Sequence, residues 1–225
     1  MAAARAGLAP DGGRALVIRG ISAWATAAMV CVAAAALTNL AAAFLPIVDL
    51  RAVHHPGPAT TGLASALRVV AALVLFGFVL GFAVAWGGWS RRARGNLLGF
   101  GVRSRRVVDS VGRAPEVRRR MRVLTWLLWS TVLAAVVTRL LAWSAGRSTA
   151  GEIGEVRAQA WAGQPVDDAL AAHLFGRELV LGLPAAVLFV LAAALTMVFV
   201  GRVTSAQYGR VARLRARELA GAFGS

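Results

Sequence analysis

Apolar residues run along the chain in four long stretches that are separated by charged segments. The stretches cover about residues 21–48, 69–89, 123–143 and 179–200. A helix needs roughly 20 residues to cross the hydrocarbon core of a bilayer, and each stretch is at least about that long. Since no water reaches that core, a spanning segment must satisfy its backbone internally, as a helix does. The pattern predicts an all-α integral membrane four-helix bundle with short connections between antiparallel neighbours.

Arginine is distributed unevenly among the segments that connect these predicted spans. Nineteen arginines lie in residues 1–20, 90–122 and 201–225, against five in residues 49–68 and 144–178. Short arginine-rich loops stay on the cytoplasmic side of a membrane. We therefore expect a multi-pass protein of a bacterial plasma membrane with both termini in the cytoplasm. Its parts are a cytoplasmic segment 1–20, a four-span membrane domain 21–200 with a cytoplasmic loop 90–122 and outer loops 49–68 and 144–178, and a basic tail 201–225.

Composition supports a membrane location and suggests a class of partner. The chain is 58% hydrophobic and only 16% charged, yet its formal net charge is +15, with arginine as its basic residue. Such a charge would suggest nucleic acid in a soluble protein. Beside membrane spans, anionic lipid headgroups are the nearer partner, with an acidic protein or a second copy of the chain as alternatives, and nucleic acid is not expected. The residues expected to bind these partners are Arg91, Arg92, Arg94, Arg105, Arg106, Arg118, Arg119 and Arg120.

Two strongly polar residues lie inside the predicted spans. Asn39 is expected to hydrogen-bond a neighbouring helix or the backbone. Arg139 lies four residues before Trp143, so its long side chain can reach the outer interface. The alternative is a charge that faces a cavity in the bundle, where Asp49 or Glu178 would pair with it.

Small residues recur every four positions in the second span, at Gly77, Gly81 and Ala85. This spacing places them on one stripe of a helix, where a neighbouring backbone can approach closely. We interpret the stripe as packing within the chain, with a dimer interface as the alternative. Farther along, Gln164–Asp167 is typical of a break followed by an N-cap, so a helix is expected from Asp168. Pro184 either kinks the fourth span or marks its start.

The predicted spans carry few residues that could act in catalysis or bind a metal. The three histidines, His54, His55 and His173, fall in predicted outer loops, and Cys31 is the single cysteine. The spans hold no paired carboxylates or Ser/His/Asp set, so no cofactor and no enzymatic activity are expected. The main hypothesis is a small structural or regulatory subunit. The alternatives are an oligomeric transporter or channel component that uses Arg139 and Asn39, or an intramembrane enzyme or redox protein.

The entry to the third span resembles an actinobacterial family of four-span membrane proteins known as a domain of unknown function. That family has Gly-x-Pro-Phe, then Asn, then Arg-Leu-Arg at this point. Gly112–Pro115 is similar to the start of the pattern with one extra residue, although Glu116 stands in place of Phe. Arg120–Arg122 is similar to its end. The resemblance implies the four-span layout and carries no assigned activity.

Overall fold

The computed structural model describes residues 20–55, 58–99 and 115–223. Arg105, Arg106 and Gly112 lie outside these residues. Every regular element in the described part is a helix, which confirms the all-α prediction. The elements are α1 (Ser22–Ala42), α2 (Leu45–His54), α3 (Pro58–Gly99), α4 (Pro115–Arg147), α5 (Ala150–Trp161) and α6 (Asp168–Phe223).

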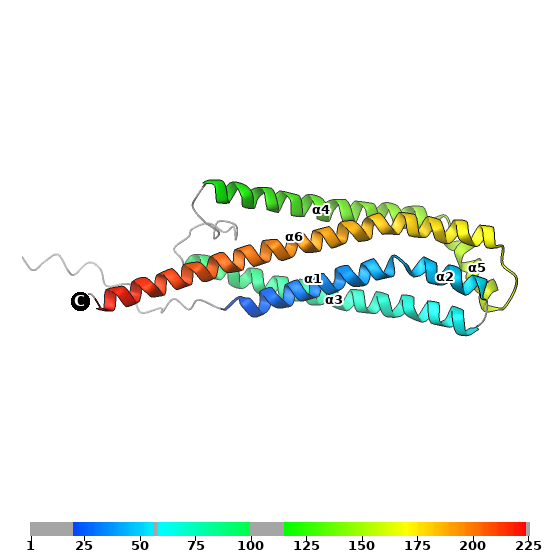
Figure 1. Cartoon of the computed structure of the whole chain (residues 1–225), viewed down its shortest axis with the longest axis horizontal. Helices are drawn as coiled ribbons and strands as arrows, with labels where there is room; N and C mark the ends of the chain where they lie inside the picture. Colours follow the sequence, from blue (N-terminus) through cyan, green and yellow to red (C-terminus); the bar gives the residue numbers. More distant parts are fainter. Residues whose placement is uncertain (1–19, 56–57, 100–114, 224–225) are drawn as a thin grey trace, which may run out of the picture.

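Four helical passes are long and apolar enough to cross a membrane, as the sequence predicted. They are α1 continued by α2, then most of α3, α4 and α6. The predicted spans lie within these longer helical segments. Helix α1 begins, α3 ends, α4 begins and α6 ends at one end of the molecule, which we call the terminal end (Figure 1). Helices α2 and α5 lie at the opposite end, which we call the α5 end.

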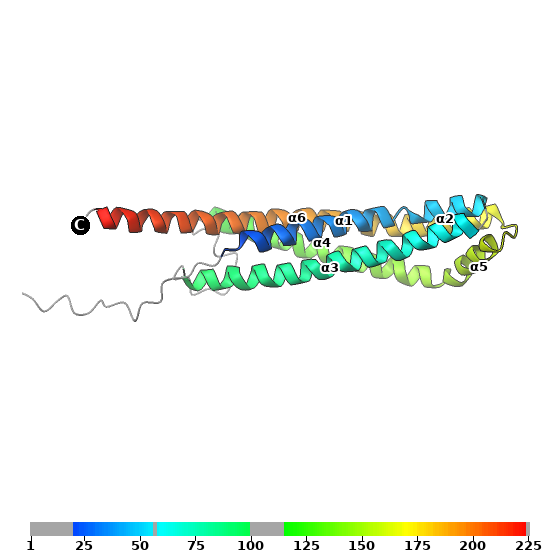
Figure 2. The same ribbon diagram turned by 90° about the horizontal axis from the view of Figure 1, so that it is seen from below.

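The long helices pack in the order α3–α1–α6–α4 (Figures 1 and 2). Helix α1 lies between α3 and α6, and α6 lies between α1 and α4. In the described part of the chain, α3 and α4 make no extended contact, although they follow one another in sequence. Packing along the chain therefore gives two helical hairpins, α1–α3 and α4–α6, which are joined through α1 and α6.

Small side chains allow α1 to approach both of its neighbours closely. Val32 and Ala36 of α1 and Ala193 of α6 are buried in one cluster, so small side chains lie at the α1–α6 contact. On the α3 side, a Cβ added at Gly81 would lie 3.1 Å from Cys31 Sγ. A Cβ added at Gly88 would lie only 2.4 Å from the ring of Trp24. Small residues at helix contacts are the usual means of close packing where lipid surrounds a protein.

The first span is broken near its far end by Pro46. Helix α1 ends at Ala42, and α2 begins at Leu45 with Pro46 in its first turn. Proline has no N–H group, and its ring clashes with the carbonyl four residues earlier, which here belongs to Ala42. The break therefore follows from this proline, and α2 continues the same pass to His54.

Helix α5 packs across the end of the bundle. Ile153, Val156 and Ala160 are its buried residues, and they pack with Val53 of α2 and Phe175 of α6. Positions 153, 156 and 160 share one helix face, so α5 is held by a single apolar stripe. Its outward face carries the acids Glu152 and Glu155.

Helix α6 begins where the sequence predicted an N-cap. Asp167 Oδ1 accepts hydrogen bonds from the backbone N–H groups of Ala169 at 2.9 Å and Leu170 at 3.3 Å. The capping prediction is confirmed, because these donors have no partner within the helix. Pro184 lies inside the continuous helix α6, so it does not mark the helix start.

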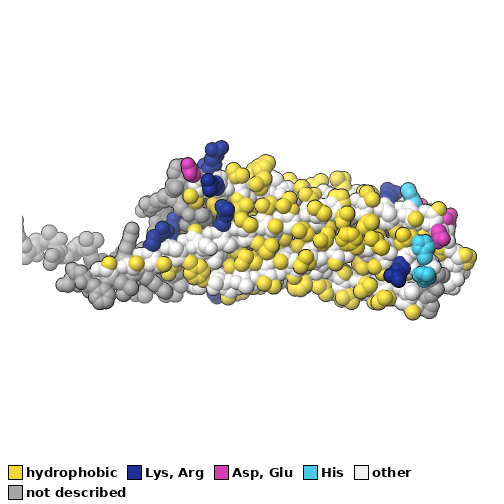
Figure 3. Space-filling model, viewed as in Figure 1, with side chains coloured by type: hydrophobic (Ala, Val, Ile, Leu, Met, Phe, Trp, Pro, Cys, Tyr) yellow, Lys and Arg dark blue, Asp and Glu magenta, His cyan; other side chains and the backbone are white. Residues whose placement is uncertain are grey.

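The surface between the two ends is apolar (Figure 3). Large side chains on α3 and α4 are exposed, among them Phe76, Trp129 and Leu141. Arginines are visible at the terminal end, and acids, histidines and arginines at the α5 end (Figure 3). Apolar surface of this extent is what lipid contact requires and what water disfavours.

Candidate functional site

A cluster of four charged side chains lies at the α5 end and joins four helices. Asp49 of α2 accepts hydrogen bonds from Arg68 of α3 and, at 2.8 Å, from Arg157 of α5. Glu178 of α6 accepts one from Arg68 Nη1 at 3.1 Å and lies 3.7 Å from Arg157 Nη2. Two carboxylates therefore oppose two guanidinium groups, and the cluster carries no net charge.

Burial makes the pairing within this charge cluster important for the stability of the fold. The Asp49 side chain is only 5% exposed, while those of Arg68 and Arg157 are 27% and 37% exposed. A buried carboxylate must be paired, because its transfer out of water is costly. Among the described residues, the buried Nε atoms of both arginines have no hydrogen-bond partner. The cluster thus holds α2, α3, α5 and α6 in register, and loss of one member leaves an uncompensated charge.

The alternative in which Arg139 pairs with Asp49 or Glu178 is not found. Both acids pair with Arg68 and Arg157, and the described residues give Arg139 no ion pair. Arg139 lines a cavity of about 210 Å³ together with Asn39, Arg68 and Glu178. The two strongly polar residues of the spans therefore lie in one cavity, at the edge of the charge cluster.

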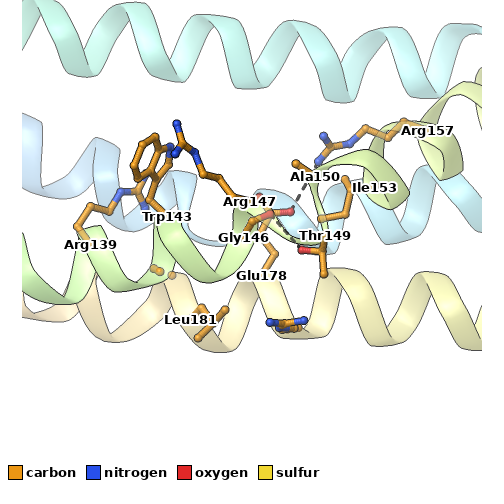
Figure 4. Close-up of a pocket in the computed structure, with 13 residues that line it drawn as sticks. Arg139, Trp143, Gly146, Arg147, Thr149, Ala150, Ile153, Arg157, Glu178 and Leu181 are labelled. Carbon is orange, nitrogen blue, oxygen red and sulfur yellow. Dashed lines mark hydrogen bonds and ion pairs between the residues drawn. The ribbon is translucent and has the colours of Figure 1, made fainter.

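A second cavity, of about 330 Å³, lies between α4, α5 and α6 (Figure 4). It shares Arg139, Glu178 and Gly182 with the smaller cavity. Glu178 of α6 is joined to Arg157 of α5 across this space (Figure 4). The guanidinium of Arg147 stacks 3.8 Å from the ring centre of Trp143, which fixes it at the cavity wall.

At the terminal end, a groove of about 600 Å³ runs between α4 and α6. Three arginines at this groove come from both helices: Arg119, Arg120 and Arg202. Toward the α5 end, its wall is apolar. The residues of that wall are Val123, Leu124, Leu127 and Val198. A neighbouring hollow on the same two helices is also lined by Arg120 and Arg202.

The other predicted arginines are arranged differently. Arg91 and Arg94 are exposed near the end of α3. Arg92 instead donates to the carbonyl oxygen of Gly20 at 3.0 Å and lies 5.5 Å from the ring centre of Trp24, so it holds the start of α1. Arg118 is exposed on the first turns of α4.

The predicted stripe of small residues divides between two environments. Gly81 lies against Cys31 of α1, and Ala85 is buried. Gly77 has nothing within 4 Å of the Cβ position and is exposed. Within the chain, the stripe therefore packs at Gly81 and Ala85. The close approach to α1 continues at Gly88, whereas Gly77 takes no part in it.

Several structural residues were missed by sequence reasoning. Arg68 and Arg157 were counted only as loop charges. Arg68 directly precedes the second predicted span, and this position beside an apolar run was a signal for pairing with an acid such as Asp49, whereas Arg157 in mid-loop gave no such signal. Gln207 of α6 is 1% exposed, and its Nε2 donates to the carbonyl oxygen of Ala93 at 3.1 Å. Asn96 Nδ2 donates to Gln207 Oε1 at 3.3 Å. These amides join α3 to α6 near the terminal end.

Comparison with known proteins yields no further constraint. No protein-family model, curated protein or solved structure matches the chain. Within the described residues, no three His, Cys, Asp or Glu side chains are grouped so that they could hold a metal ion. Of the residues that carry the resemblance to the four-span family, Pro115 begins α4, and Arg120–Arg122 lie in its first turns.

Proposed function

We propose that the chain is a non-enzymatic multi-pass protein of a bacterial plasma membrane, whose arginine-rich terminal end faces the cytoplasm and binds anionic lipid headgroups. Four apolar helices and the excess of arginine in segments that connect at the terminal end support this orientation. Membership of the actinobacterial four-span family is part of the same proposal, and rests on the residues around Pro115.

The observation that carries the proposal is the groove between α4 and α6. Arg119, Arg120 and Arg202 supply cationic groups, and an apolar wall follows them along α4 as far as Leu127. Seven residues of helix separate Arg120 from Leu127, which corresponds to roughly 10 Å. A charged head beside an apolar wall of this length is the shape of a phospholipid at the boundary between headgroup and acyl chain. Glu116 at the mouth leaves the groove with an excess of positive charge.

Charge removal at the groove tests this function. Each arginine near an anionic surface contributes about 1 kcal/mol at low salt. Replacement of Arg119, Arg120 and Arg202 by glutamine should therefore weaken binding of phosphatidylglycerol about a hundredfold. Native mass spectrometry of the detergent-purified full chain measures retained phosphatidylglycerol against phosphatidylcholine.

A matched variant separates the groove from general charge at the same end. Arg91, Arg94 and Arg213 are exposed and do not line the groove, and their replacement by glutamine removes the same charge. The sequence alone placed Arg91 and Arg94 among the binding residues, so this variant also tests that broader expectation against the groove. Lipid retention should then persist. Equal loss in both variants, or no preference of the wild-type chain for phosphatidylglycerol, would reject the groove as the lipid site. An acidic protein that co-purifies and is lost only in the groove variant would replace lipid as the partner.

One observation favours transport as a second candidate function. Asn39 and Arg139, the strongly polar residues of the predicted spans, line the same cavity. Transporters use polar and ionisable side chains inside the membrane to hold solutes. This candidate expects a flux of chloride or succinate in proteoliposomes that is lost in Arg139→Gln, whereas a structural role expects no flux.

A further inference from the structure

The two cavities at the α5 end adjoin one another through a shared part of their lining. They have Arg139, Glu178 and Gly182 in common, and their volumes are about 330 and 210 Å³. Known small-molecule sites occupy about 300 to 1,000 Å³. Together they are therefore large enough for a small metabolite. Their lining comes from α1, α2, α3, α4, α5 and α6.

Positive charge exceeds negative charge in the larger cavity. Arg139, Arg147, Arg157 and Arg177 line it, against the single carboxylate of Glu178. That carboxylate is already shared between Arg68 and Arg157. In the part of the chain that the structure describes, no carboxylate lies within ion-pair distance of the remaining three arginines.

The three uncompensated arginines are not equivalent. Arg147 stacks on Trp143, and Arg177 donates to the carbonyl oxygen of Ala145 at 3.5 Å. Among described residues, Arg139 has neither a hydrogen bond nor a ring contact, and it alone of the three also lines the smaller cavity. Its guanidinium is therefore the donor available to a molecule that spans both cavities.

The positive charge of Arg139 lies within a predicted membrane span and needs a partner. Arg139 lies on the apolar part of α4, about 6 Å before Trp143 along the helix axis. An ionised side chain there is costly unless it reaches the interface or finds a counter-charge. A guanidinium offers a planar pair of N–H donors that match the oxygens of a carboxylate or a phosphate. An oxyanion would thus supply the counter-charge for Arg139 that the described part of the protein does not.

The geometry points to a binding site for a small organic anion, with a carboxylate or phosphate group held by Arg139 and flanked by Arg147 and Arg177. The first turn of α5, at Thr149 and Ala150, also lines the cavity and adds the positive partial charge of a helix N-terminus. Asn39, on the wall of the smaller cavity, is an amide that can hydrogen-bond the remainder of the molecule. The oxyanion comes either from a free solute or from a lipid headgroup.

Calorimetry on the detergent-purified full chain, with succinate and inorganic phosphate as probes, tests the free-solute source. Saturable binding is expected, with affinity reduced at least tenfold in Arg139→Gln and only severalfold in Arg139→Lys, which keeps the charge. Arg51→Gln is the matched control, because Arg51 is an exposed arginine of α2 that does not line either cavity. Its affinity should stay within about twofold of wild type.

Phosphatidylglycerol in nanodiscs, measured by native mass spectrometry, tests the headgroup source. Retention that depends on Arg139, without binding of either soluble probe, assigns the oxyanion to lipid. Absence of saturable binding by all three probes, or equal binding by wild type and a folded Arg139→Gln, would show that Arg139 only reaches toward the interface, and would overturn the site. The groove variant of Arg119, Arg120 and Arg202 should leave this binding unchanged, so the two proposals fail independently.

Discussion

Replacement of Gly88 by alanine would place a methyl group against the ring of Trp24. The added Cβ would lie 2.4 Å from Cε3 and 2.7 Å from Cδ2 of that ring. Trp24 is partly buried against the core at the terminal end and has the guanidinium of Arg92 beside it, so the ring cannot move away without cost. Insertion of a methyl group into a well-packed core costs about 1–3 kcal/mol.

The neighbouring Gly87 provides the reference for this prediction. It has nothing within 4 Å of its Cβ position and is exposed on the same helix. Both substitutions gain the same helix propensity, about 1 kcal/mol for glycine to alanine. The difference between the variants therefore isolates packing, and Gly88→Ala should be less stable than Gly87→Ala by about 1–3 kcal/mol.

Unfolding of the detergent-purified chain by SDS, followed by circular dichroism, measures this difference. In a Trp24→Leu background the cost of Gly88→Ala should shrink, because the ring that the methyl group meets is absent. Contacting residues are expected to show such coupling, of about 0.5–3 kcal/mol. Two alanine variants of equal stability, or an unchanged cost in the Trp24→Leu background, would refute the close approach of α1 and α3.

The remaining predictions concern the α5 end. Asp49→Asn should lower the free energy of unfolding by roughly 3 kcal/mol, near the lower limit for a broken buried ion pair because both arginines are partly exposed. Its control is Glu152→Gln on the exposed face of α5, and equal stability of the two variants in the same SDS assay would contradict the role of the cluster. Asp167→Ala should lose about 1 kcal/mol through the missing cap. Hydrogen exchange should then quicken at Ala169 and Leu170, and unchanged exchange there would contradict the capping role.

The apolar pattern was enough to predict the four long helices, because length and hydropathy alone decide which segments can span a bilayer. The cap at Asp167 was predictable too, since its signal is local in sequence. Helix α5 was missed. Its buried positions, Ile153, Val156 and Ala160, follow a helical spacing, but the stripe is short and its acidic face resembles a loop.

Pairing among charges was not predictable from position along the chain. The sequence predicts a similar depth in the membrane for Asp49, Arg139 and Glu178. This similar depth was the only ground for expecting them to pair. Depth does not fix the direction in which each helix turns its side chains or the order in which helices lie. Because α3 and α5 bring Arg68 and Arg157 to the acids, Arg139 on α4 is left beside the cluster. The packing order α3–α1–α6–α4 is likewise a property of side-chain fit, which a hydropathy pattern does not contain.

The two-hairpin arrangement bears on how the chain is made. Because α1 packs on α3 and α4 packs on α6, we expect each half of the chain to complete its own helix pair as it leaves the ribosome. The contacts between the halves would form afterwards: the packing of α1 and α2 on α6, the charge cluster at the α5 end, and the hydrogen bonds of Gln207 to α3. Two polypeptides divided between α3 and α4, expressed together, should therefore assemble into the same bundle. Assembly would then reduce to the docking of two preformed halves, with the covalent connection between them serving mainly to keep their stoichiometry equal.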